Sequence, residues 1–179
     1  MSNIRQQTRG VPRLGDRVYV DPAATIIGDV QLGDDCSVWP ATVIRGDVNR
    51  ITIGKRCSIQ DASVLHVTHA GPHTGDGWPL IIGNDVTVGH RAVLHGCHLG
   101  NQILIGIGSI VMDGAVVEDQ VVIGANSLVA PGKTLRSGHL YLGSPARKAR
   151  KLSQEELDYF RYTAANYVRL KNDYLKAND

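Results

Sequence analysis

Three histidines, His66, His90 and His95, have the residue type and spacing of ligands for one metal ion. His66 and His95 each directly follow a leucine, and His90 lies five residues before His95. Imidazole is a preferred ligand of zinc, and three protein ligands with an open fourth position are typical of a catalytic rather than a structural zinc. The chemistry that this set indicates is generation of hydroxide from a water molecule at a bound divalent cation.

Simpler interpretations of single histidines stay open, because an exposed histidine usually binds no metal. His69 and His73 lie in a segment rich in Gly, Pro and His, and we expect flexible surface residues or the rim of a pocket there. His98 and His139 are assigned no role. Cys97 is a candidate thiolate ligand, although a small buried residue is the simpler reading.

A period of six residues positions the histidines. Large side chains recur at this interval in Ile105, Val111, Val117, Ile123, Val129, Leu135 and Tyr141. The period fits neither an amphipathic helix nor an alternating strand. It predicts a triangular solenoid in which each short side sends one large aliphatic inward, and successive turns of about 18 residues stack at a strand spacing of about 4.8 Å. A sandwich of ordinary strands is the alternative, but sandwiches do not hold one six-residue register over residues 105–141.

The same period brings two of the histidines together. It runs earlier through Leu65, Ile82, Val88 and Leu94, provided that segment 66–81 replaces the short corner between two successive sides of the triangle. His66 and His95 then point outward from the same side, about one strand spacing apart, close enough to share a metal ion. His90 lies on the preceding side and can join that metal only from a second copy of the chain. A threefold trimer would create three such sites.

The period stops after Pro145, and a helix follows. Ser153 and Glu156 form a capping-box pattern, and apolar residues at helical spacing predict a helix over residues 154–176. The expected organisation is an N-terminal segment at 1–16, a β-helix at 17–146 with an inserted loop at 66–81, and a C-terminal helical segment at 153–177 that packs on the solenoid.

Composition argues against several classes of protein. The 179 residues fit one domain, and a formal net charge of +2 gives no electrostatic case for binding nucleic acid or an anionic membrane. The sequence contains no run of 18 apolar residues and no hydrophobic region near its N-terminus, so it does not predict insertion into a membrane or export. Cys36, Cys57 and Cys97 are odd in number and lack a CxxC spacing, so we expect a reduced, cytoplasmic protein.

Five short motifs resemble those of the gamma-class carbonic anhydrases, and specifically their shorter bacterial cytosolic members. They are Ile44-Arg45-Gly46-Asp47, Ile59-Gln60-Asp61, Leu65-His66, Val88-Gly89-His90 and Leu94-His95-Gly96, within a resemblance that covers roughly residues 11–179. The resemblance places the chain in the hexapeptide-repeat (isoleucine-patch) superfamily and implies a left-handed parallel β-helix. The six-residue period does not determine that handedness, since crossovers between parallel strands are normally right-handed.

The resemblance also implies a homotrimer with metal sites shared between subunits. His66 and His95 of one subunit and His90 of its neighbour would bind zinc, with iron(II) or cobalt as alternatives. Gln60 would orient the metal-bound water. The residues that would form supporting ion pairs near the interface are Arg45, Asp47 and Asp61.

The implied reaction is reversible hydration of carbon dioxide to bicarbonate by a metal-bound hydroxide. Val48 and His69 stand where the prototype of the class carries glutamates that export the proton, so His69 is a candidate substitute relay. Three rival functions remain: an acyltransferase that uses acyl-coenzyme A and a single histidine base, a metal-dependent thioesterase or other hydrolase, and a non-catalytic assembly subunit.

Overall fold

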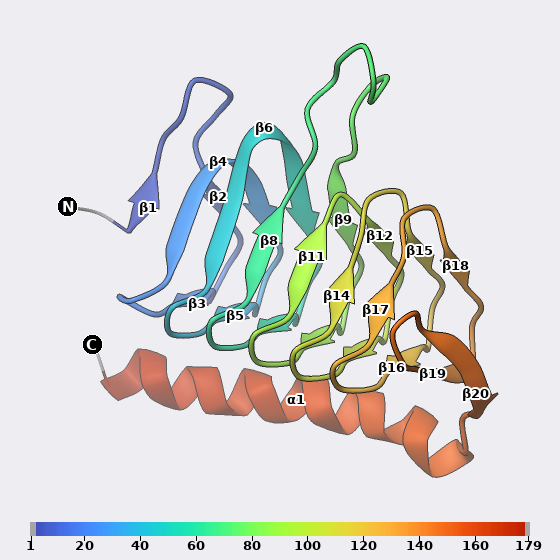
Figure 1. The fold of residues 1–179 in the computed structure, drawn as a ribbon. Helices are drawn as coiled ribbons and strands as arrows, with labels where there is room; N and C mark the ends of the chain where they lie inside the picture. Colours follow the sequence, from blue (N-terminus) through green and yellow to red (C-terminus); the bar gives the residue numbers. More distant parts are fainter. Residues whose placement is uncertain (1–2, 178–179) are drawn as a thin grey trace.

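The computed structural model describes residues 3–177 as a β-solenoid of short parallel strands with one C-terminal helix (Figure 1). Each strand inside the coil pairs with strands one turn before and one turn after it, and the strands at its two ends pair on one side. The parallel solenoid that the six-residue period predicts is therefore confirmed. Within the described residues, the helix is not apolar enough over a sufficient length to cross a bilayer.

The three sides of the coil form two sheets. A 12-stranded sheet covers two sides, because β4 (Thr25–Leu32) and β6 (Val43–Ile53) each continue from one side to the next. The first side continues with β8 (Val64–His66), β11 (Val93–His95), β14 (Ile110–Val111) and β17 (Leu128–Val129). The second continues with β9 (Leu80–Ile82), β12 (His98–Leu99), β15 (Val116–Val117) and β18 (Thr134–Leu135).

An eight-stranded sheet forms the third side. Its parallel strands are β3 (Tyr19–Val20), β5 (Ser37–Val38), β7 (Ser58–Ile59), β10 (Thr87–Val88), β13 (Leu104–Ile105), β16 (Val122–Ile123) and β19 (His139–Leu142). The antiparallel β20 (Arg147–Lys151) closes this sheet with an exposed, basic strand. At the other end of the solenoid, β1 (Ile4–Arg5) and β2 (Arg13–Leu14) pair with β4.

Stacked aliphatic side chains form the core. On the first side, the register aligns Ile44, Leu65, Leu94, Val111 and Val129, and all five are fully buried. Each turn therefore covers the apolar surface of the next. This burial stabilises the fold by about 25 cal/mol per Å² of apolar area removed from water. This stacking holds the residues that follow each aliphatic in a fixed outward position.

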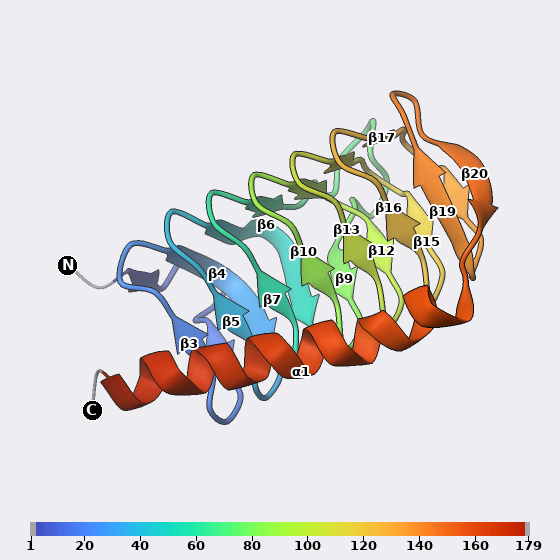
Figure 2. The same cartoon turned by 90° about the horizontal axis from the view of Figure 1, so that it is seen from below.

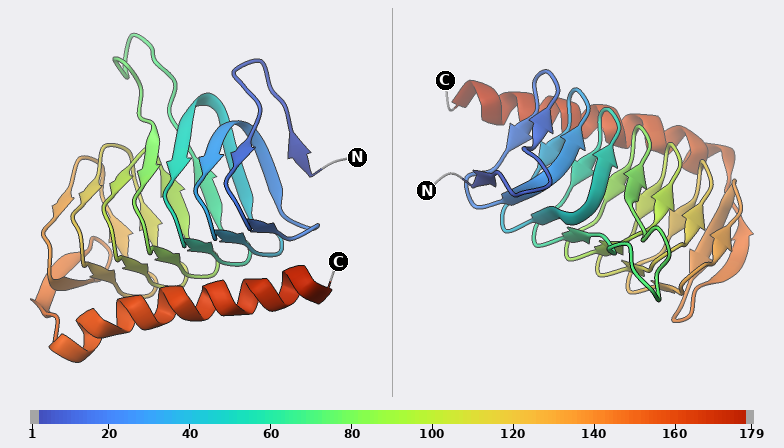
Figure 3. Two further views of the ribbon diagram at one scale, coloured as in Figure 1. Left: turned by 180° about the vertical axis from the view of Figure 1, so that it is seen from behind. Right: turned by 90° about the horizontal axis from the view of Figure 1, so that it is seen from above.

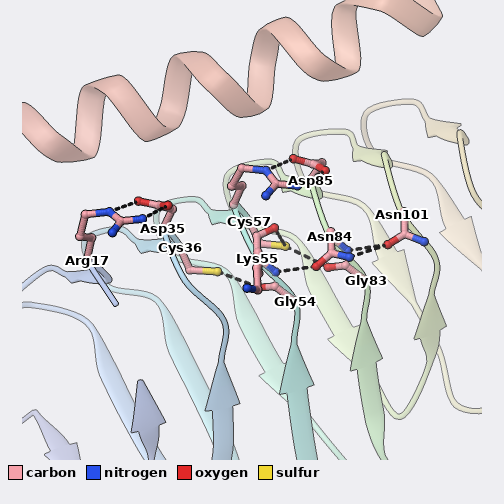
Figure 4. A network of polar contacts seen from close by, with 11 residues as sticks. Arg17, Asp35, Cys36, Gly54, Lys55, Cys57, Gly83, Asn84, Asp85 and Asn101 are labelled. Atoms are coloured by element: carbon pink, nitrogen blue, oxygen red, sulfur yellow. Dashed lines mark hydrogen bonds and ion pairs between the residues drawn. The ribbon is translucent and has the colours of Figure 1, made fainter. Parts of the chain in front are cut away.

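One corner of the coil carries a ladder of polar side chains (Figure 4). Arg17, Asp35, Arg56 and Asp85 occupy equivalent turn positions with φ between 53° and 60°. Arg17 donates two hydrogen bonds to Asp35, at 3.0 and 2.7 Å, and Arg56 donates two to Asp85, at 2.6 and 2.7 Å. These bidentate ion pairs link successive turns at positions where left-handed backbone costs a non-glycine residue about 1–2 kcal/mol.

Helix α1 (Gln154–Ala177) runs back along the third side and ends beside β3 and β5 (Figure 2). The predicted capping box is present, since Glu156 N donates to Ser153 Oγ at 3.2 Å and Ser153 N donates to Glu156 Oε2 at 2.9 Å. Phe160 and Ala164 are buried. Near its end, the ring centroid of Tyr174 lies 5.2 Å from that of Trp39.

An ion pair between a buried lysine and a partly exposed aspartate also holds the helix on the solenoid. Lys171 is fully buried, and its Nζ donates to Asp35 Oδ1 at 3.0 Å. Replacing Lys171 with alanine is expected to lower the free energy of unfolding by about 1–2 kcal/mol, because the substitution removes a charged hydrogen bond to Asp35, which keeps its contact with Arg17. Urea unfolding measures this change. Lys176→Ala, on an exposed side chain of the same helix, should change stability by less than about 0.5 kcal/mol.

The same contact predicts an acid dependence of stability. The hydrogen bonds from Arg17, and secondarily that from Lys171, lower the pKa of Asp35 to about 2 despite the opposing effect of burial. The folded-state pKa lies below the unfolded value of about 3.9, so the stabilisation of about 2 kcal/mol is complete above that value and is lost as the pH falls toward 2. Arg17→Ala should weaken this dependence more than Lys171→Ala; the reverse order would contradict the assignment.

The inserted loop is shorter than residues 66–81. His66 belongs to β8, and Leu80 and Ile81 belong to β9, so the projecting segment is residues 67–79. Antiparallel bridges join Thr68 to Trp78 and Gly71 to Gly75, which narrows the loop into an arm that stands away from the coil (Figure 3). The prediction extended too far because strand pairing, which sequence composition does not show, continues up to His66 and resumes at Leu80.

Candidate metal centre

His66 and His95 lie side by side on the first side of the solenoid. They are paired in register at the ends of β8 and β11. His66 Nδ1 lies 3.0 Å from His95 Nε2, and the two ring centroids are 5.0 Å apart. Both side chains are partly exposed, at 18% and 29%. The expected juxtaposition of these two histidines, one turn apart, is present.

In each ring, one nitrogen faces the other histidine (the inner nitrogen), and the second nitrogen (the outer nitrogen) contacts a carboxylate. His66 Nε2 lies 3.0 Å from Asp47 Oδ1, and His95 Nδ1 lies 2.6 Å from Asp113 Oδ1. These contacts favour a proton on each outer nitrogen and leave the lone pairs of the two inner nitrogens facing each other. Carboxylate-held imidazoles of this kind are the usual form of histidine ligands in metal sites.

The donor set fits a divalent cation. Two lone pairs that face each other at 3.0 Å repel unless a cation or a proton lies between them. Tetrahedral zinc with bonds of about 2.0–2.1 Å would set two nitrogens about 3.3 Å apart, close to the spacing observed. The pair therefore supplies two nitrogens suited to zinc.

Electrostatics around His66 favour the neutral, metal-binding form. Burial lowers the pKa of His66 below its ordinary value, although the hydrogen bond to Asp47 acts in the opposite direction. Burial by itself raises the pKa of Asp47, but hydrogen bonds with His66 and Arg45 outweigh it and leave the pKa below the ordinary range. Asp47 thus stays ionised between the histidine and the arginine, in an ion pair with Arg45.

His90 lies at a different corner of the coil. Its Nδ1 is 2.9 Å from Asp61 Oδ2, and both side chains are nearly half exposed. The described part of the chain contains no group of three His, Cys, Asp or Glu residues that could hold a metal ion together. One chain thus presents a pair of imidazoles at one corner and a single, carboxylate-held imidazole at another.

Gln60 lies at the corner of His90, not beside the His66–His95 pair of its own chain. It is buried, with 5% of its surface exposed, and its backbone N donates to Val88 O at 2.9 Å. Its side-chain Nε2 donates to the hydroxyl of Tyr167, whose pKa is raised by burial. Gln60, Thr163 and Tyr167 help to line a cleft of about 290 Å³ between helix α1 and the third side.

The loop contributes Thr68 rather than His69 to the histidine cluster. His69 is exposed, whereas Thr68 Oγ1 donates to Asp113 Oδ2 at 3.0 Å. Val48, at the other altered position, packs against the apolar core. Asp113, Thr68 and Tyr167 were not predicted as site residues from the sequence. Asp113 lies 18 residues after His95, one residue more than the 17-residue turn that pairs Leu94 with Val111, so neither Asp113 nor Tyr167 had a usable signal in the period.

Known proteins resemble this chain in sequence and structure along nearly its whole length. No protein-family model matches. The chain is 54% identical over 176 residues to protein YrdA of Escherichia coli, and the alignment covers 98% of this chain and 96% of that protein. It is 40% identical over 166 residues to a carbonic anhydrase of Geobacillus kaustophilus, and that alignment covers 93% of this chain and 87% of the anhydrase.

A solved structure agrees with these relationships. The crystal structure of a hexapeptide transferase family protein from Anaplasma phagocytophilum superposes with a TM-score of 0.88 at 39% identity, covering 96% of this chain and 97% of that one. Fold, sequence identity and coverage all point to the same group of proteins. The chain therefore belongs to the gamma carbonic anhydrase-like (YrdA) family of the hexapeptide-repeat transferase superfamily.

Proposed function

We propose that the protein is a trimeric metalloenzyme that hydrates carbon dioxide reversibly to bicarbonate. The observation that carries the proposal is the pair of inner nitrogens of His66 and His95, 3.0 Å apart with each outer nitrogen against a carboxylate. His90 of a neighbouring subunit supplies the third ligand. Its Nδ1 is held by Asp61, which leaves Nε2 free to bind the same cation. Zinc is the expected metal, with iron(II) or cobalt as alternatives.

An apolar stripe beside the histidine pair supports the trimer. Val64, Val93, Ile110 and Leu128 align in register on the outward face of the first side. Val64 is 40% exposed and Ile110 is 36% exposed. Contiguous aliphatic surface of this kind is typical of an interaction site in a soluble protein. A neighbouring subunit that covered the stripe would approach the His66–His95 pair, as a shared site requires.

The proposed chemistry divides among the metal and the chain's own residues. A divalent cation held by these three histidines would lower the pKa of a bound water to about 7 and so would supply hydroxide at neutral pH. Neutral imidazole ligands leave the cation its full charge. The amide of Gln60, at the same corner as His90 and therefore supplied by the same neighbouring subunit, orients the attacking hydroxide, and Tyr167 positions that amide from helix α1. His69, exposed in the loop, is the candidate that passes the product proton to solvent.

Carbon dioxide hydration by protein reconstituted anaerobically with zinc, and separately with iron(II), tests the proposal. Hydration should appear with at least one metal and disappear after chelation. Gln60→Ala should reduce turnover by about 10- to 100-fold at unchanged metal content, because the substitution removes an orienting group and no ligand. Gln102→Ala, on the remote polar corner, is the matched control.

Three results would contradict carbonic anhydrase function. Metal-loaded trimers without hydration would leave an assembly protein as the better description. Hydrolysis of a thioester by the same loaded protein, without hydration, would favour the metal-dependent hydrolase. Acyl transfer from acyl-coenzyme A that survives metal removal would favour the acyltransferase.

A further inference from the structure

Asp113 connects the histidine pair to the projecting loop. Its two carboxylate oxygens have different partners: Oδ1 lies 2.6 Å from His95 Nδ1, and Oδ2 accepts a hydrogen bond of 3.0 Å from Thr68 Oγ1. Within residues 3–177, no Lys or Arg side chain forms an ion pair with Asp113, whereas Asp47 on the other histidine is paired with Arg45. The orientation of the Asp113 carboxylate therefore depends on a neutral hydroxyl donated by the loop.

Thr68 is itself held firmly in place. Its backbone carbonyl accepts a hydrogen bond of 3.0 Å from Asn49 Nδ2, and its backbone N and O both pair with Trp78 at 3.0 Å. Asn49 belongs to the long strand β6, so the base of the loop is tied to the solenoid at this point. The hydroxyl that reaches Asp113 thus projects from an ordered part of the loop.

Trp78 of the loop packs against the backbone next to His95 and Asp113. A Cβ placed on Gly96 would lie 2.6 Å from the Trp78 Cβ, and one on Gly114 would lie 3.1 Å from the edge of the indole ring. Gly96 directly follows His95, and Gly114 directly follows Asp113. Only residues without a side chain leave room for Trp78 here, so the loop packs directly over the backbone of the ligand and of its carboxylate partner.

We propose that Asp113 is the positioning residue for His95 and that loop 67–79, through Thr68, sets the metal affinity of the site. The Nδ1–H···Oδ1 hydrogen bond holds His95 in the tautomer whose Nε2 lone pair faces His66. The Thr68 hydroxyl prevents the carboxylate from rotating away. This inference rests on the proposed metal site but does not require that the protein hydrate carbon dioxide.

Zinc affinity, measured on the full-length protein by competition with a chromophoric chelator, tests the inference. Asp113→Asn keeps the shape of the side chain and should weaken zinc binding by about 10- to 100-fold. Thr68→Val should weaken it by a smaller factor, about 3- to 10-fold, because Asp113 remains present. Thr74→Val is the matched control, since the Thr74 hydroxyl donates to His69 O within the same loop and touches neither histidine of the pair.

A double-variant cycle separates positioning from general loosening of the loop. If Thr68 acts through Asp113, then Thr68→Val should have little further effect in the Asp113→Asn background. Fully additive losses of affinity would overturn the coupling. An unchanged dissociation constant in folded Asp113→Asn protein would overturn the role of Asp113.

A measurement on metal-free protein keeps this test independent of the proposed function. Nitrogen chemical shifts of the His95 ring report its tautomer, and the Nδ1–H form should dominate in the wild type and in Thr74→Val. The Nε2–H form should gain population in Asp113→Asn. A tautomer that is unaffected by Asp113→Asn would contradict the inference even if the wild-type protein proved to be an active carbonic anhydrase.

Discussion

Replacing His66 and His95 together with alanine is expected to abolish metal binding and leave the solenoid folded. The two rings supply the facing nitrogens of the site. Loss of one supporting hydrogen bond typically lowers metal affinity by about 10- to 100-fold, and loss of both rings should lower it further. Both side chains are partly exposed and lie outside the aliphatic core, so unfolding in urea should change little. Elemental analysis of protein purified without chelator should find about one divalent ion per chain in the wild type and almost none in the variant.

The matched control replaces two histidines that the site does not use. His98 is exposed on the second side, and His139 Nδ1 lies 2.7 Å from the backbone carbonyl oxygen of Ser137, far along the coil from the pair. A His98→Ala/His139→Ala variant should keep the full metal content of the wild type. Stoichiometric metal in folded His66→Ala/His95→Ala protein, or well-folded wild type that takes up no supplied zinc, would rule out this site.

Mixing two inactive variants should restore metal sites if His90 comes from a neighbouring subunit. His90→Ala chains keep the histidine pair, and His66→Ala/His95→Ala chains keep His90. In a cyclic trimer, every mixed assembly contains one interface with all three ligands. Random assembly at equal ratio should therefore restore about one quarter of the wild-type metal content after co-refolding, and the same share of any hydration activity.

A second mixture shows whether the recovery reports a shared site. His66→Ala chains mixed with His95→Ala chains should recover nothing, because the two nitrogens 3.0 Å apart belong to one chain and no interface can reunite them. Recovery in this mixture would mean that chains exchange strands rather than share a metal. Absence of recovery in the first mixture, in trimers shown by mass spectrometry to be mixed, would mean that His90 is not a ligand.

Contacts between successive turns were predictable from the sequence, because a solenoid makes them between residues at a fixed separation. The six-residue period set the phase of each inward aliphatic, and that phase brought His66 beside His95 across an insertion. The period did not locate Asp113, because the turn from β11 to β14 pairs Leu94 with Val111, 17 residues on, and leaves Asp113 one residue beyond the position over His95. Turn-to-turn register is thus a local property, determined by the pattern of large aliphatic residues.

Contacts across long sequence separations were decided only by the tertiary structure. Gln60 meets Tyr167 across 107 positions, and Lys171 meets Asp35 across 136, because helix α1 packs on the third side. No period relates the helix to the coil, so its docking depends on side-chain shape and on one ion pair. The bend of loop 67–79 that delivers Thr68 to Asp113 likewise follows from packing of Trp78 on two glycines. The sequence determined which residues the coil aligns, and folding of the helix and the loop onto that coil decided which other side chains reach them.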